Sequence, residues 1–72
     1  STDEEKRAQI DSVIRFRAAH DQESPAALRR LQTVALSGGN VFAELLSTVR
    51  VATLGQITHA LYKVGGEYRR NL

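Results

Sequence analysis

The stretch that decides the fold is residues 34–46, VALSGGNVFAELL. Its glycine pair, Gly38-Gly39, is typical of a helix C-terminus, because glycine adopts the left-handed conformation of a C-cap without steric strain. Asn40 follows directly, and asparagine is a preferred N-cap because its side chain accepts a hydrogen bond from a free amide at the start of a helix. We therefore expect one helix to end and another to begin here, across a short connection.

Similar signals mark other helix starts. Thr2 with Glu5, and later Thr53 with Gln56, have the spacing of a capping box, in which the two side chains satisfy free backbone amides of the first turn. The chain could also continue through Thr53 as one bent helix. We favour a break, because β-branched residues and the nearby Gly55 weaken a continuous helix.

Ser24-Pro25 predicts a further start, with Ser24 as the N-cap and proline at the first helical position, where its missing N–H costs nothing. The second glycine pair, Gly65-Gly66, predicts a helix C-terminus like the first. No segment alternates with the period of two that a half-buried strand requires. The sequence thus predicts one all-α segment over residues 1–72, with about four short helices near residues 3–20, 25–37, 41–51 and 54–64.

The apolar residues of each predicted helix form a narrow stripe. In residues 3–20 the stripe consists of Ile10, Val13 and Ile14, which Ala18 could extend, and Phe16 falls off it. Such thin stripes bury little area for an independent bundle, so we expect some of these faces to dock on a surface outside this chain. The predicted packing anchors, all aliphatic residues of the last two helices, are Leu45, Leu46, Val49, Ile57 and Leu61.

Composition excludes several classes of protein. The 72 residues include no cysteine and no methionine, so neither a disulfide framework nor a thiolate metal site can support the fold. No apolar run approaches the roughly 20 residues that span a bilayer, and the acidic opening Asp3-Glu4-Glu5 is unlike a signal peptide. We expect a soluble, cytoplasmic protein.

Charge is distributed unevenly along the chain. Residues 1–23 carry six acidic and four basic side chains, a balance of −2, whereas residues 24–72 carry two acidic and six basic ones, a balance of +4. The arginine pairs Arg29-Arg30 and Arg69-Arg70 could bind carboxylate or phosphate groups of a partner, or could be solvated residues of helix surfaces. The sequence assigns no individual role to these four arginines.

No catalytic, cofactor-binding or metal-ligating residue is predicted. The only histidines, His20 and His59, do not stand at a metal-binding spacing, and the glycine pairs fit no phosphate-binding loop. Residues 49–61 loosely resemble a helix-turn-helix, which leaves a stand-alone protein-interaction or nucleic-acid-binding module as an alternative. Only Arg50 and Lys63 flank that segment, and two positive charges are few for a DNA-binding surface.

Three stretches carry a resemblance to a known family: residues 38–46, 49–57 and 60–70, which read GGNVFAELL, VRVATLGQI and ALYKVGGEYRR. They resemble the end of the substrate-binding large chain of adenosylcobalamin-dependent acyl-CoA mutases, the family of methylmalonyl-CoA mutase. The closing VGGEYRRNL is most similar to the fused isobutyryl-CoA mutases, in which the mutase chain also carries a GTP-hydrolysing chaperone domain. Residues 9–31 are similar to the family as well.

The resemblance implies a helical appendage that follows a (β/α)8 barrel and packs on the barrel or at a contact with a sister subunit. Activity would belong to the whole enzyme, as a carbon-skeleton isomerisation such as that of isobutyryl-CoA to n-butyryl-CoA. Adenosylcobalamin, and GTP with Mg²⁺ in the fused type, would bind elsewhere in the parent enzyme, because this sequence has neither the family's Asp-x-His-x-x-Gly motif nor a phosphate loop.

The implied partners are the remainder of the mutase chain or a sister subunit and, through the parent enzyme, the acyl-CoA substrate. Neither a membrane nor a nucleic acid is expected as a partner. The length of 72 residues then suggests that this chain is the end of a large enzyme. The hydrophobic core that these helices lack would belong to other residues of that enzyme.

Overall fold

A computed structural model describes the backbone of residues 2–70 and the side chains of residues 2–66. It contains four α-helices, which are α1 (Asp3–Ala19), α2 (Ser24–Ser37), α3 (Val41–Thr48) and α4 (Leu54–Arg70). The described residues include no β-strand, so the all-α prediction is confirmed.

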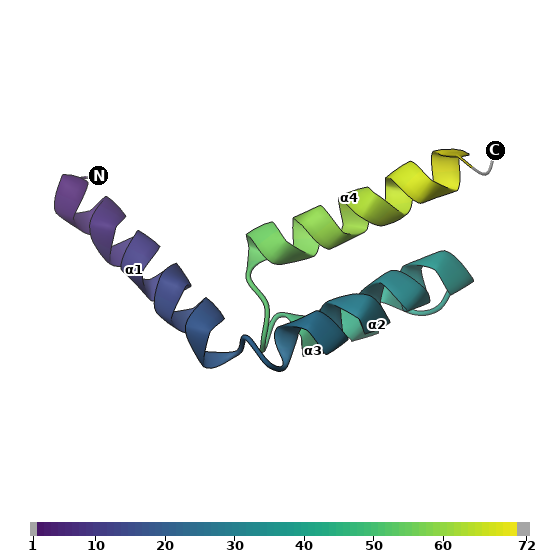
Figure 1. Ribbon diagram of the computed structural model, residues 1–72, viewed down its shortest axis with the longest axis horizontal. Coiled ribbons are helices and arrows are strands. Elements are labelled where there is room, and N and C mark those ends of the chain that lie inside the picture. Colours follow the sequence, from purple (N-terminus) through teal and green to yellow (C-terminus); the bar gives the residue numbers. More distant parts are fainter. Residues whose placement is uncertain (1, 71–72) are drawn as a thin grey trace.

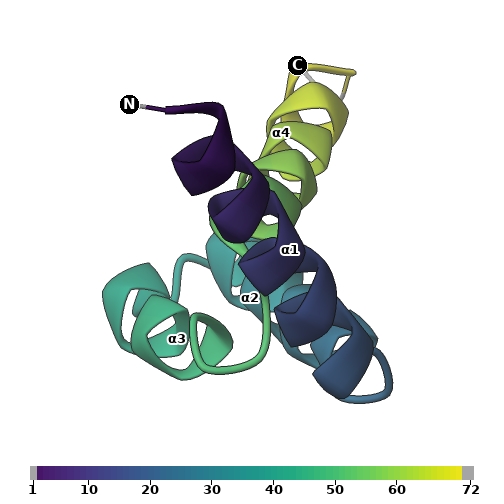
Figure 2. The same cartoon turned by 90° about the vertical axis from the view of Figure 1, so that its left-hand side faces the viewer.

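Helix α2 lies at the centre of the packed part of the chain. It contacts both α3 and α4, while α1 projects away from the other three helices (Figure 1). In Figure 2 helix α1 lies in front, on the side that faces the viewer. The Cα radius of gyration is 14.3 Å, and the chain extends over 46 × 22 × 19 Å. A compact domain of this length would have a radius of gyration of about 11 Å. The larger value follows from α1, which extends the chain along its longest axis (Figure 1).

The small core lies between α2, α3 and α4. Its buried apolar residues are Ala27, Leu31, Ala52, Ile57 and Ala60. Leu31 is fully buried at 0% exposure and forms a cluster with Ala52 and Ile57. The half-buried aliphatic residues that pack around this cluster are Leu28, Val41, Leu45 and Leu61. Because several of the core side chains are alanines, each contact removes little apolar area from water.

The predicted capping box before α4 is present. The Thr53 hydroxyl oxygen accepts a hydrogen bond from the Gln56 amide at 3.2 Å, and the Gln56 side-chain oxygen accepts one from the Thr53 amide at 2.9 Å. These reciprocal bonds satisfy two backbone donors at the helix start. The predicted break between α3 and α4 is thereby confirmed, and it places Ala52 in the core at 3% exposure.

Other predicted caps are present as well. Thr2 accepts a hydrogen bond from the Glu5 amide at 3.2 Å, and Asn40 accepts one from the Ala43 amide at 3.1 Å. Gly38 has a φ of 77°, the left-handed conformation expected directly after α2. Local backbone chemistry therefore determines where α1 and α3 begin and where α2 ends.

The predicted N-cap at Ser24 is wrong. Ser24 is the first residue of α2, its side chain is buried, and its amide donates to the His20 carbonyl at 2.9 Å. The Glu23 amide donates to the same carbonyl at 3.1 Å. The backbone carbonyl of His20, in the turn between α1 and α2, thus accepts from both amides. The Glu23 and Ser24 amides therefore need no side-chain cap.

Two predicted helix ends are also corrected. Helix α3 ends at Thr48 rather than near residue 51, because the chain leaves the helix to turn Ala52 into the core. Helix α4 does not stop before Gly65-Gly66 but continues to Arg70. A glycine inside a helix costs only about 1 kcal/mol relative to alanine, which does not oblige the helix to end. Of the described glycines only Gly38 has a positive φ.

Candidate docking surface

Helix α3 and its C-cap residue Val49 carry two apolar stripes that are offset by one residue. Val41, Leu45 and Thr48 form the inner stripe, and Thr48 is buried at 1% exposure while the other two are half-buried. The outer stripe consists of Phe42, Leu46 and Val49. At about 100° per residue, the apolar residues of the two stripes together cover an arc of roughly 140°. The rest of the chain covers only the inner part of this arc.

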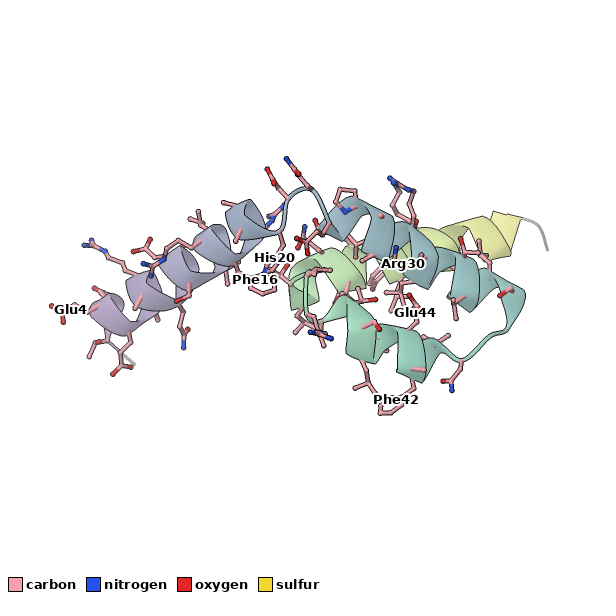
Figure 3. The ribbon with its side chains drawn as sticks, turned by 90° about the horizontal axis from the view of Figure 1, so that it is seen from below. Glu4, Phe16, His20, Arg30, Phe42 and Glu44 are labelled. Carbon is pink, nitrogen blue, oxygen red and sulfur yellow. The ribbon has the colours of Figure 1, made fainter. Side chains whose placement is uncertain are left out.

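The outer stripe is solvent-exposed. The exposed fractions are 69% for Phe42, 59% for Leu46 and 53% for Val49. Figure 3 shows the Phe42 side chain pointing away from the other helices. An amphipathic helix normally turns an apolar stripe at least about 100° wide towards its packing partner, and the outer part of this stripe lies in solvent. We therefore regard the outer stripe as a candidate docking surface.

The structure divides the five predicted packing anchors between two faces. Ile57 lies in this chain's own core at 4% exposure, and Leu45 and Leu61 pack half-buried against that core. Leu46 and Val49 point outward and remain candidates for contact with a partner. The sequence analysis did not include Phe42 among the anchors, although it completes the helical spacing with Leu46 and Val49. That i, i+4, i+7 spacing is the signal that could have identified it.

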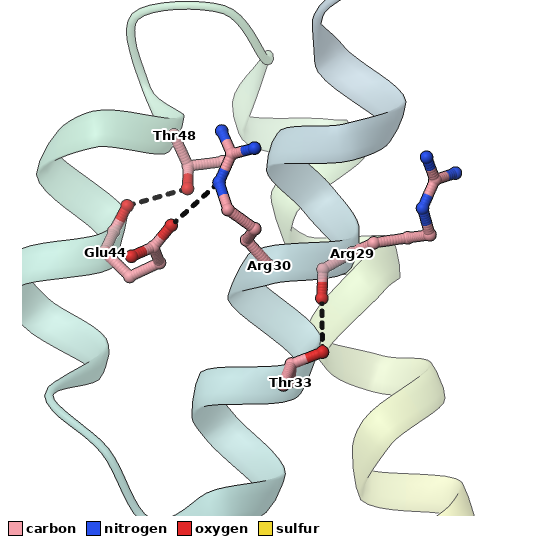
Figure 4. Close-up of polar contacts among 5 residues, drawn as sticks. All are labelled: Arg29, Arg30, Thr33, Glu44 and Thr48. Atoms are coloured by element: carbon pink, nitrogen blue, oxygen red, sulfur yellow. Dashed lines mark hydrogen bonds and ion pairs between the residues drawn. The ribbon is translucent and has the colours of Figure 1, made fainter.

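A polar contact joins α3 to α2 (Figure 4). The Arg30 Nε lies 3.6 Å from a carboxylate oxygen of Glu44, and the Thr48 hydroxyl donates to the Glu44 carbonyl at 2.7 Å. Neighbouring Arg29 points away from this ion pair (Figure 4), and its carbonyl accepts a hydrogen bond from the Thr33 hydroxyl at 3.0 Å. Glu44 therefore lies on the side of α3 that faces α2.

Helix α1 carries a second exposed stripe, here named the α1 stripe. It consists of Ile10, Val13 and Ile14, with exposed fractions of 58%, 47% and 59%. No residue of α1 is buried. Phe16, which falls off this stripe, is half-buried, and its ring centroid lies 4.6 Å from that of His20 at the end of the helix.

No group of three or more histidine, cysteine or acidic residues among the described side chains could hold a metal ion. The Nδ1 atom of His20 lies 3.5 Å from a Glu23 carboxylate oxygen, whereas His59 is exposed on α4. The side chains of Arg69 and Arg70 lie outside the described residues. No described helix combines the length and the apolar content that crossing a bilayer requires.

Sequence comparison relates this chain to much longer proteins. All 72 residues align with the fused isobutyryl-CoA mutase of Paraburkholderia xenovorans at 53% identity, where they cover 6% of that protein. All 72 residues also align with the fused isobutyryl-CoA mutase of Geobacillus kaustophilus at 54% identity and with that of Cupriavidus metallidurans at 47% identity. They cover 7% of each of these two proteins. In sequence, the chain corresponds to a segment of the fused isobutyryl-CoA mutases.

The chain thus spans less than a tenth of the length of the fused isobutyryl-CoA mutases that it matches. No protein-family model matches it. No solved structure matches it significantly either. Both exposed stripes lie inside the aligned segment, because the alignment covers the whole chain.

The helix-turn-helix alternative is not favoured by this similarity to the fused isobutyryl-CoA mutases. The geometry of α4 also weakens it. Gln56, which would have to face DNA bases, instead uses its side-chain oxygen to accept hydrogen bonds from the Thr53 amide and hydroxyl.

Proposed function

We propose that this chain is a structural, non-catalytic part of an adenosylcobalamin-dependent acyl-CoA mutase. The observation that carries the proposal is the alignment of all 72 residues with fused isobutyryl-CoA mutases at 47–54% identity in three bacteria. In this proposal the segment is the C-terminal helical part that follows the barrel. The whole enzyme isomerises an acyl-CoA, such as isobutyryl-CoA to n-butyryl-CoA, in the cytoplasm.

The cofactors of the proposed enzyme bind outside this segment. A large cofactor binds in a concave, mostly apolar pocket, and GTP with Mg²⁺ needs a phosphate-binding loop. His20 packs against Phe16 and lies 3.5 Å from a Glu23 carboxylate oxygen, and His59 is exposed on α4. The glycine pairs lie at a helix end and inside a helix, not in a phosphate loop.

The proposed role of the segment is to pack the outer stripe against the remainder of the mutase, either its barrel or a sister subunit. Phe42, Leu46 and Val49 are all more than half exposed, and burial of one such side chain stabilises by about 1.5–3 kcal/mol. Packing of this stripe would therefore supply stability that the small core of the segment lacks.

The test uses the complete polypeptide that contains this sequence. We expect it to isomerise isobutyryl-CoA when supplied with adenosylcobalamin. The double variant F42S/L46S should lower the unfolding temperature of the mutase while leaving the KM for acyl-CoA unchanged, because the outer stripe holds no substrate group. The control is L36S, which replaces a leucine of similar exposure, 52%, on α2.

Two results would count against the proposal, and they are separable. Absence of isomerisation by the unmodified polypeptide would show that the mutase assignment is wrong. Normal isomerisation together with an unfolding temperature of F42S/L46S equal to that of the L36S control would show that the outer stripe is not a packing surface.

A further inference from the structure

Helix α1 contributes almost nothing to the core of this chain. It has 17 residues, none of which is buried, and it makes no extensive contact with α2, α3 or α4. Isolated helices of about this length are marginally stable in water, because most helical stability in proteins comes from packing of an apolar face. A stable α1 therefore requires a covering surface for its own stripe.

The attachment of α1 to the rest of the chain is confined to its last turn. Phe16 packs on the His20 ring, and the His20 carbonyl accepts the Glu23 and Ser24 amides that lead into α2. The α1 stripe lies further towards the N-terminus, on the part of the helix that projects away (Figure 1). The core of α2, α3 and α4 cannot cover this stripe in the arrangement observed.

Two kinds of occupant could cover the α1 stripe: a second copy of the chain or another part of the same polypeptide. A stable complex between separate molecules buries roughly 800 Å² on each partner. Three aliphatic side chains on one helix face supply only a small part of that area. A surface of the same polypeptide needs far less contact, because covalent linkage provides an effective concentration in the millimolar range.

The relatives contain ample polypeptide to provide such a surface. This chain covers only 6–7% of their length. Lys6 and Gln9 border the α1 stripe, so the covering surface should offer hydrogen-bond acceptors beside its apolar residues.

We infer that α1 is a docking arm whose stripe, Ile10, Val13 and Ile14, packs against another part of the same polypeptide. This inference rests on the proposed function, in which the segment belongs to a much longer mutase chain. In this inference α1 and the unit of α2, α3 and α4 have different roles. Helices α2, α3 and α4 fold around their own core, whereas α1 folds on the surface that it binds.

The experiment measures hydrogen exchange of the α1 amides in the complete polypeptide by mass spectrometry. In the unmodified protein we expect α1 to be protected. The double variant I10N/I14N should speed exchange in α1 at least tenfold, with α2–α4 unchanged and the oligomeric state unaltered. The matched control, A8N/S12N, places the same two side chains on the opposite, exposed face of α1 and should retain protection.

Three outcomes would overturn the inference. Rapid exchange of α1 in the unmodified protein would mean that nothing covers the stripe. Retained protection in I10N/I14N would mean that the stripe is not the docking face. Protection that falls on dilution, with dissociation of I10N/I14N into smaller species, would identify a second copy as the occupant. A lack of isomerisation by the unmodified protein would overturn the mutase assignment and not the inference about α1. The hydrogen exchange of α1 tests that inference separately.

Discussion

Gln32 in α2 donates a hydrogen bond from its side-chain amide to the carbonyl oxygen of Ala60 in α4, at 3.1 Å. The two residues are 28 positions apart, whereas every other side-chain hydrogen bond among the described residues joins positions within four of each other. This bond lies at the part of α4 where Ala60 is buried at 5% exposure. It therefore fixes the register of α2 and α4, which apolar contacts alone specify poorly.

Replacing Gln32 by alanine should lower the free energy of unfolding of the 72-residue chain by about 1 kcal/mol, the usual net value of a hydrogen bond. The Ala60 carbonyl keeps its helical environment in the variant, so the loss should not be larger. Urea unfolding followed by circular dichroism measures the change. The exposed Gln22 serves as the control site, and an equal loss for Q22A would show that the α2–α4 bond is not the cause.

Leu31→Ala should destabilise the chain by about 2–5 kcal/mol, because it leaves a cavity at a large aliphatic side chain that is 0% exposed. The small core of α2, α3 and α4 leaves little stability to lose. Much of the helical signal should therefore be lost at room temperature. Leu36→Ala, on the same helix but 52% exposed, should change the urea midpoint little, and similar losses at both sites would contradict the observed core.

Thr53→Ala should remove the hydroxyl that accepts the Gln56 amide and weaken the start of α4 by about 1 kcal/mol. Thr53→Ser keeps a hydroxyl at this position and should retain most of the stability. Amide hydrogen exchange in residues 54–57 reports the effect directly. Equal exchange rates in the two variants would mean that the capping box does not stabilise this helix.

The exposed ion pair between Arg30 and Glu44 should contribute little to stability. Its two side chains are 63% and 24% exposed, and such pairs have coupling energies below about 1 kcal/mol. A double-mutant cycle with R30A and E44A measures this coupling, which should decrease further when salt is added. A large, salt-independent coupling would show that the pair is more shielded from water than the structure indicates.

Substitutions of glycine by alanine should have opposite effects at the two glycine pairs. Gly38 has a positive φ, so Gly38→Ala should destabilise the chain by about 1–2 kcal/mol. Gly66 lies inside α4 with open space where a Cβ atom would be added, so Gly66→Ala should stabilise the isolated chain by up to about 1 kcal/mol. Thermal unfolding of both variants distinguishes them by the sign of the change.

Those parts of the fold that depend on local chemistry could be predicted from the sequence. The caps at Asn40 and Thr53 and the C-cap at Gly38 involve residues within a few positions of each other, and all three are observed. The end of α4 was not predictable in the same way. Gly65 and Gly66 have no special backbone conformation, and their weak helix propensity is outweighed by continuation of the helix.

The division of the packing anchors between two faces could not be predicted, for a different reason. Leu45 and Leu46 are adjacent and equally apolar, so the periodicity of α3 does not say which of them faces α2. The choice depends on the rotation of the helix, which is set by contacts with residues that are distant in sequence. Leu31, to which Leu45 lies close, and the Arg30–Glu44 pair provide that information only in the folded chain.

The projection of α1 has a mechanical consequence. At 1.5 Å per residue, a helix of 17 residues is a rod of about 25 Å, and a rotation of 10° at residues 20–23 would displace its far end by about 4 Å. Small adjustments around His20 are thus converted into large displacements at Thr2. The direction of α1 should consequently respond strongly to changes in the surface around it. Distance probes at the two ends of α1 would detect a rearrangement of that surface.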